Sequence, residues 1–169
     1  MIKINNSAPE FQEEAFINNE IKKISLSDYK GKWVILFFYP GDFTFVCPTE
    51  LEELAKHYHE IKELGAEVIS VSTDSVYVHK AWHDSSPTIK QVKFPMLADR
   101  SMRVSKSYGT LIEETEDALR ATFLIDPDGI VKAYEFHNND IGRSIKELIR
   151  KLQATEFTRQ NKGEVCPMN

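Results

Sequence analysis

The sequence predicts an α/β fold in which a central mixed β-sheet is sandwiched between helices. Apolar runs of strand length alternate along the chain with segments whose apolar residues recur at three- and four-residue spacing. Toward the C-terminus two strand-like runs are joined by a tight turn, and a helix follows them. Helices interleaved with strands are typical of layered α/β folds. With 169 residues, no internal repeat and no linker-like segment, the chain is expected to form a single domain, residues 1–169.

The first clear strand and helix lie between residues 33 and 64. Residues 33–39 read WVILFFY, a run that is apolar on both faces and suits a central strand covered on both sides. Residues 48–64 are expected to form a helix, because Pro48 fits the first helical position and Gly65 fits a left-handed cap. The apolar side of this helix is made by Leu51, Leu54, Tyr58, Ile61 and Leu64.

The middle of the chain continues the alternation of strands and helices. Residues 67–72, EVISVS, are expected to form a second strand. A helix is expected at residues 75–84 and a shorter one at residues 102–108.

The C-terminal third predicts a strand, a turn, a strand and a helix. Residues 121–126 and 130–136 are the two strands, and the sequence DPDG between them is typical of a tight turn. Residues 141–152 are expected to form the closing amphipathic helix. From about residue 157 the chain is expected to be a loose tail, because QNKGEVCPMN has little periodicity.

Composition excludes several classes of function. The chain is 41% hydrophobic and 28% charged, as expected for a globular protein, and its net charge is −5. Lys and Arg are scattered, so no basic stripe for nucleic acid is expected. No apolar run approaches the roughly 20 residues of a membrane span. The first residues, MIKINNSAPEF, lack the pattern of a secretory signal, so a cytoplasmic location is expected.

The two cysteines are too few for a disulfide framework, and Cys47 stands at an unusual place. It follows a buried strand and opens a helix, where unpaired N–H groups and the helix dipole favour a negatively charged sulfur. A reactive thiolate and a small apolar residue packed at a helix start both fit this placement. A thioredoxin-like CxxC site is excluded because Glu50 stands three residues on, and a metal site at Cys47 is poor because no second cysteine or histidine stands at ligand spacing from it.

The residues around Cys47 carry a more specific signal. Pro40, Thr44 and Cys47 form the pattern P-x-x-x-T-x-x-C, with Glu50 next, which resembles the active-site signature of peroxiredoxins. The wider run FYPGDFTFVCPTE is similar to the two-cysteine branch of that family. Further resemblances lie at VSTDS, HKAWH, RATFLIDPDG, IGR and GEVCP, and so cover nearly the whole chain. The resemblance implies a thioredoxin-like sandwich and a thiol-dependent peroxidase that reduces hydrogen peroxide and organic hydroperoxides.

The chemistry of peroxide reduction explains the residue types of this motif. A thiolate at Cys47 attacks one peroxide oxygen in line while the other oxygen leaves with growing negative charge, so hydrogen-bond donors along that line are needed. The Thr44 hydroxyl can accept from or donate to the peroxide, and the Cys47 N–H is available as a donor because a helix start leaves such groups free. Pro40 has no N–H and can shield the thiolate without competing for its lone pairs.

Two arginines and a glutamate complete the site that the resemblance implies. Arg120, in RATF, is expected to hold the thiolate and a peroxide oxygen with its rigid fork of donors. Glu50 is expected to orient it, although an acid in a first helical turn is also ordinary. Arg143, in IGR, matches a second family arginine, but a solvated arginine at a helix start fits the sequence nearly as well.

Cys166, in GEVCP, is similar to the family's resolving cysteine. The resemblance implies that the sulfenic acid of the first cysteine condenses with the tail cysteine of a partner subunit, hence a homodimer, with dimers joining into a ring of five. It also implies thioredoxin or a flavoprotein disulfide reductase as electron donor. Relatives that are sensitive to over-oxidation carry a Gly-Gly-Leu-Gly loop and a terminal helix ending in Tyr-Phe. Only Pro167, Met168 and Asn169 follow Cys166 here, so resistance to over-oxidation is expected.

Other signals are weaker. His79 and His83 lie four residues apart and could bind a metal, but a metalloprotease motif needs Glu where Lys80 stands, and no third ligand is evident. No Gly-rich phosphate loop is present, so no nucleotide, flavin or other cofactor is expected. A non-catalytic redox sensor or holdase chaperone with the same fold and thiol is the alternative function.

Overall fold

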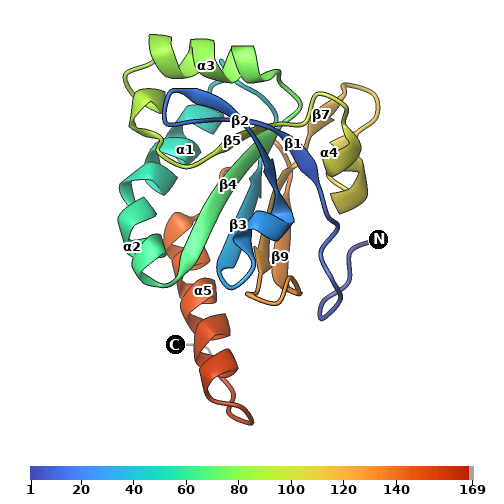
Figure 1. Cartoon of the computed structure of the whole chain (residues 1–169), viewed down its shortest axis with the longest axis vertical. Helices are drawn as coiled ribbons and strands as arrows, with labels where there is room; N and C mark the ends of the chain where they lie inside the picture. The colour runs from blue at the N-terminus through green and yellow to red at the C-terminus, as the bar shows by residue number, and fades with distance from the viewer. Residues whose placement is uncertain (168–169) are drawn as a thin grey trace.

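The computed structural model describes residues 1–167 and places a seven-stranded mixed sheet at the centre of the molecule (Figure 1). The last two residues of the expected tail, Met168 and Asn169, lie outside the described residues. The strand order is β2-β1-β5-β4-β3-β8-β9. β3 (Trp33–Phe38) pairs in parallel with β4 (Ala66–Ser72) and antiparallel with β8 (Arg120–Ile125). The mixed sheet expected from the sequence is therefore confirmed.

The two outer parts of the sheet are hairpins. At one side β1 (Gln12–Ile17) pairs with β2 (Glu20–Ser25), and β1 also pairs with β5 (Met96–Ala98). At the other side β8 pairs with β9 (Val131–His137), as the DPDG turn predicted. The sequence analysis missed the first hairpin. Its signal was Asn18-Asn19, which adopts φ values of 51° and 61°, as a two-residue hairpin turn of the primed type requires.

Helices cover both faces of the sheet and explain why β3 is apolar throughout. Alternate residues of β3 contact two separate apolar clusters. The first cluster lies under α1 (Cys47–Lys56), α2 (Tyr58–Glu63), α3 (Val76–Ser85), η2 (Ile89–Gln91) and α5 (Ile145–Gln160). The second lies under η1 (Leu26–Tyr29), α4 (Arg103–Tyr108) and the small sheet of β6 (Leu111–Ile112) and β7 (Asp117–Ala118).

Two expected helices differ from the structure. The helix expected at residues 48–64 is divided at His57, whose φ of −92° and ψ of 2° depart from helical geometry. After this bend the Tyr58 hydroxyl donates to Glu67 of β4 at 2.9 Å.

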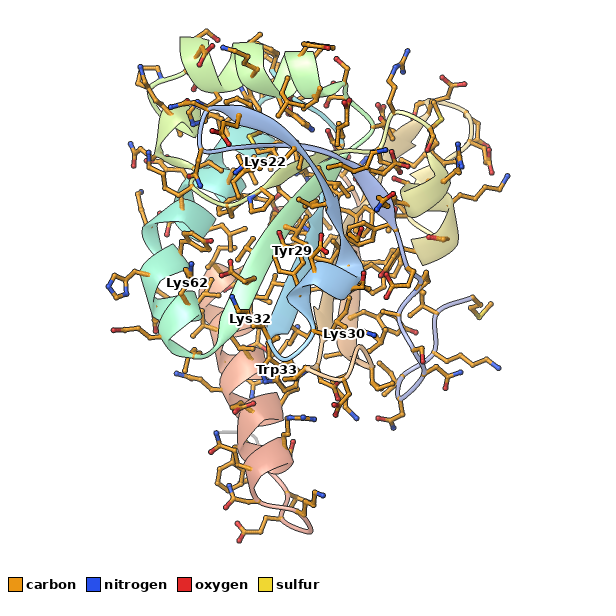
Figure 2. All side chains as sticks on the ribbon, viewed as in Figure 1. Lys22, Tyr29, Lys30, Lys32, Trp33 and Lys62 are labelled. Atoms are coloured by element: carbon orange, nitrogen blue, oxygen red, sulfur yellow. The ribbon has the colours of Figure 1, made fainter. Side chains whose placement is uncertain are left out.

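The last helix starts later than expected and is longer. It begins after Ser144, which caps it by accepting from Glu147 N, and it continues to Gln160, so the tail starts after residue 160 and not near 157. This helix projects past the end of the sheet (Figure 1). Trp33, at the start of β3, lies beside it and donates its indole N–H to Glu156 (Figure 2). Within residues 1–167, no helix combines the length and apolar character that a membrane crossing needs.

Candidate active site

Cys47 is the first residue of α1 and is completely buried. A short loop brings the chain from the end of β3 to this point, so the thiol lies where the strand and helix meet. The first N–H groups of a helix have no partner within the helix, and the helix dipole favours negative charge there. This end of α1 therefore suits a thiolate. Both cysteines of the chain are free thiols.

Arg120 is the charged group in direct contact with Cys47. It opens β8, is only 3% exposed, and its Nη1 lies 3.3 Å from Cys47 Sγ and 2.8 Å from Glu50 Oε2. Asn139 holds it in place, because Arg120 Nε donates to the Asn139 carbonyl at 2.8 Å and Arg120 N donates to Asn139 Oδ1 at 3.0 Å. The sequence analysis missed Asn139, and no motif marks it.

Arg143 is buried beside Glu50 and is not a solvated surface arginine. Its Nε and backbone N–H donate to Glu50 Oε1 at 3.0 and 2.7 Å, and its Nη2 donates to Glu50 Oε2 at 2.9 Å. Its Nη1 donates to the Ala121 carbonyl at 2.8 Å and the Thr122 hydroxyl at 3.1 Å. The guanidinium also lies 3.4 Å above the ring centre of Phe37, a residue that the sequence analysis read only as core.

Glu50 joins the two arginines. Burial alone would raise the pKa of Glu50, but the hydrogen bonds and charge of Arg143, together with the charge of Arg120, hold that pKa below its ordinary value. The carboxylate is therefore ionised at neutral pH. One carboxylate between two guanidinium groups leaves one positive charge in a buried cluster. A cluster with one positive charge suits a neighbouring group that carries one negative charge.

The remaining motif residues lie on the loop before α1. Pro40 follows β3 and is half-buried. The hydroxyl of Thr44 donates to the Gly41 carbonyl at 2.9 Å, and Thr44 itself is exposed. Thr44 thus lies on the exposed part of this loop, whereas Arg120 and Glu50 are buried.

Cys166 does not join this cluster. It is exposed, in the segment after α5, while Cys47 is buried beneath its own helix and loop. The structure therefore brings Cys47, Glu50, Arg120 and Arg143 together in one chain and leaves Cys166 outside.

The chain is similar to known proteins of one family. Residues 4–134 match the family model described as AhpC/TSA family. The chain is 48% identical to alkyl hydroperoxide reductase C of Bacillus subtilis, over 93% of this chain and 84% of that protein. It is 46% identical to alkyl hydroperoxide reductase C of Amphibacillus xylanus, over 99% of this chain and 89% of that protein.

Solved structures agree as well. The crystal structure of Enterococcus faecalis AhpC superposes with a TM-score of 0.95 at 46% identity, covering 99% of this chain and all of that one. The reduced 2-Cys peroxiredoxin of Plasmodium vivax superposes with a TM-score of 0.93 at 37% identity, covering 98% of this chain and 88% of that one.

Proposed function

This chain belongs to the AhpC/TSA family and is a peroxiredoxin, a thiol-dependent peroxidase, and from this premise we propose that Cys47 is the thiol that attacks the peroxide. The observation that carries the assignment is the contact of Arg120 Nη1 with both Cys47 Sγ and Glu50 Oε2. The relatives favour this enzyme over the alternative of a non-catalytic redox sensor or holdase chaperone.

In the first step the Cys47 thiolate attacks the terminal oxygen of a hydroperoxide. A sulfur–oxygen bond forms as the oxygen–oxygen bond breaks, which leaves a sulfenic acid on Cys47 and an alkoxide or hydroxide that takes up a proton as alcohol or water. Arg120 supports this step because its fixed fork of donors stabilises the thiolate and the departing oxygen. We assign the Thr44 hydroxyl and the Cys47 N–H to the peroxide, and Pro40 to shielding the thiolate.

Glu50 and Arg143 do not need to touch the peroxide. Glu50 accepts from Arg120 Nη1 and so fixes the plane of that guanidinium. Arg143 holds Glu50 through three hydrogen bonds and is itself held by Phe37 and β8. Both are positioning residues in this proposal.

In the second step the sulfenic acid condenses with the thiol of Cys166 to form a disulfide and water. We place this Cys166 on a partner subunit, because within one chain it lies exposed beyond α5 while Cys47 is buried. A thioredoxin or a flavoprotein disulfide reductase then returns both thiols, and a reducing cytoplasm fits this cycle.

Two exposed apolar surfaces support assembly of the subunits. Strand β9 is an edge of the sheet and carries Tyr134 and Phe136, which are 43% and 40% exposed. An unprotected edge strand with exposed aromatic side chains suits pairing with a second copy, so we assign it to the homodimer. Phe43, Phe45 and Tyr77 form a second exposed set near the loop before α1, which we assign to contacts between dimers in a ring of five.

The test is peroxide consumption with a thiol reductant, using hydrogen peroxide and cumene hydroperoxide in parallel. Wild-type protein is expected to consume either peroxide in large excess over enzyme, whereas Cys47→Ser consumes none, because a hydroxyl cannot replace the thiolate. Stoichiometric consumption by the wild type, or turnover by Cys47→Ser, contradicts the proposal. Mass spectrometry with a sulfenic-acid probe locates the oxidised residue.

A further inference from the structure

A second buried network lies on the other side of the loop that carries Thr44. The carboxylate of Asp42 accepts from the Tyr39 hydroxyl at 2.6 Å and lies 2.7 Å from His79 Nδ1. The backbone N–H of Asp42 donates to Asp74 Oδ2 at 2.9 Å. Tyr39 and His79 are fully buried, and Asp42 is 8% exposed. A loop residue is thus tied to three separate parts of the fold: the end of β3, helix α3 and the segment after β4.

His79 is a charged member of this network. Its Nδ1 faces the Asp42 carboxylate and its Nε2 lies 3.0 Å from the Leu97 carbonyl, so both ring nitrogens face acceptors. An imidazole donates from both nitrogens only when it is protonated. Burial opposes that charge, but the hydrogen bond and charge of Asp42 raise the pKa of His79 above its ordinary value.

Directly after Asp42 the backbone is strained. Phe43 has a φ of 56°, a left-handed conformation that a bulky side chain rarely adopts. Such conformations persist where the surrounding structure enforces them, and they are common where a segment moves. The side chains of Phe43 and Phe45 are 59% and 96% exposed, and Phe43 contacts Trp82 of α3. The contacts of Asp42 hold the backbone directly before this strained residue.

We propose that Tyr39, Asp42 and His79 form a fixed hinge that sets how readily the segment between Phe43 and Cys47 unwinds. This inference rests on the proposed function, in which the buried Cys47 reacts with peroxide in place but must leave its pocket to reach Cys166 of a partner subunit. In the folded conformation the contacts of Asp42 offset the strain at Phe43. Unwinding of the first turn of α1 frees the loop and weakens these contacts, so the hinge opposes unwinding and favours the peroxide-reactive conformation.

The test is stopped-flow fluorescence after a pulse of hydrogen peroxide. Trp82 reports on the loop, because its ring centre lies 6.0 Å from that of Phe43 and 6.3 Å from that of Tyr39. Two phases are expected in the wild type: a peroxide-dependent phase for sulfenic acid formation, then a peroxide-independent phase for disulfide formation, which Cys166→Ser abolishes. His79→Leu is expected to slow the first phase and to accelerate the second about tenfold or more, as loss of a hydrogen bond to a charged group allows.

Two variants separate this positioning role from general destabilisation. His79→Asn places an amide N–H near the position of Nδ1 and is expected to restore most of both rates. His83→Asn is the control, because His83 is a buried histidine one turn along α3 that packs against Phe16 and not on the loop. This variant is expected to lower the thermal midpoint and to leave the rates of both phases unchanged. If His79→Leu does not fold, Tyr39→Phe removes one donor to Asp42 and is expected to move both phases in the same directions by less.

Each outcome has a distinct meaning. The hinge is supported if His79→Leu slows the first phase and accelerates the second, and if His79→Asn restores most of both rates. Variants of His79 and Tyr39 that leave both phases at wild-type rates, or slow both together, overturn it. A wild-type protein without any peroxide-dependent phase contradicts the proposed function itself, which is a different failure.

Discussion

Replacing Glu50 by Gln tests the buried charge cluster with almost no change of shape. Glu50 Oε1 accepts two hydrogen bonds from Arg143, and Oε2 accepts one each from Arg143 and Arg120. If the Gln oxygen takes the position of Oε1, its NH₂ group faces two guanidinium donors where Oε2 stood. Two buried positive charges then remain without a carboxylate, and Arg120 loses the acceptor that orients it toward Cys47.

The expected loss follows from the burial of these groups. Glu50, Arg120 and Arg143 have side chains that are 1–3% exposed, and removing one member of such a buried pair costs about 3–5 kcal/mol. The free energy of unfolding, measured by urea denaturation at one protein concentration, should fall by that amount. Sulfenic acid formation should slow by about 10²–10³-fold, as for loss of one oriented donor in a transition state.

A matched control is Glu53→Gln, one helical turn along, whose side chain is 51% exposed and pairs with Lys56. Its urea midpoint and its rate of sulfenic acid formation should stay at wild-type values. If Glu50→Gln is as stable and as fast as Glu53→Gln, the carboxylate neither neutralises nor orients the arginines.

The stability of Glu50→Gln should also depend on pH differently from that of the wild type. Because the pKa of Glu50 is lowered in the folded protein, its contribution to stability is complete above the ordinary value of 4.5 and is lost as pH falls through the lower folded value. Wild-type protein should therefore lose this part of its stability below about pH 4.5. The stability difference between wild type and Glu50→Gln should shrink over that range. A difference that is constant down to full acid denaturation contradicts the assigned ionisation.

The remaining predictions concern the thiols and the sheet edge. Arg120→Ala should keep the circular dichroism spectrum of the wild type but slow sulfenic acid formation by about 10²–10³-fold; unchanged kinetics would move the role of this arginine elsewhere. Equal amounts of Cys47→Ser and Cys166→Ser protein, mixed and treated with peroxide, should give one disulfide-linked dimer band on a non-reducing gel, whereas monomer alone speaks against resolution between subunits. Tyr134→Lys on β9 should shift the protein toward monomer in sedimentation velocity, whereas Ile21→Lys on the opposite edge strand, where Ile21 is 40% exposed, should not; a stable dimer of Tyr134→Lys places the interface elsewhere.

Short sequence patterns predicted those parts of the fold that depend on interactions between neighbouring residues. The apolar run of β3, the helix start marked by Pro48 and the DPDG turn each depend on a few neighbouring residues, and all three are present in the structure, with the helix beginning one residue earlier, at Cys47. The break at His57 and the extension of α5 to Gln160 were missed, because helix ends depend on tertiary contacts as much as on propensity.

The candidate site likewise has a part that the sequence predicted and a part that only tertiary contacts show. The motif identified Cys47 and its neighbours in sequence, but it could not show that Asn139 holds Arg120, because that contact joins a loop to a strand that begins 19 residues earlier. His79 was read as a possible metal ligand through its spacing from His83. Its real partner, Asp42, lies 37 residues away and only the fold brings the two together.

The Glu50 cluster also determines when during synthesis the thiol acquires its electrostatic environment. Arg120 and Arg143 stand 70 and 93 residues after Glu50. At about 5–20 residues per second on a ribosome, Cys47 emerges roughly 5–20 s before Arg143 does. Until Arg120 emerges, 73 residues after Cys47, the nascent chain contains an unpaired thiol without either guanidinium beside it, and until Arg143 emerges the cluster lacks its second arginine. A chain truncated before β8 should consequently carry an ordinary cysteine, and peroxide reactivity should appear only when the C-terminal third has been made and folded.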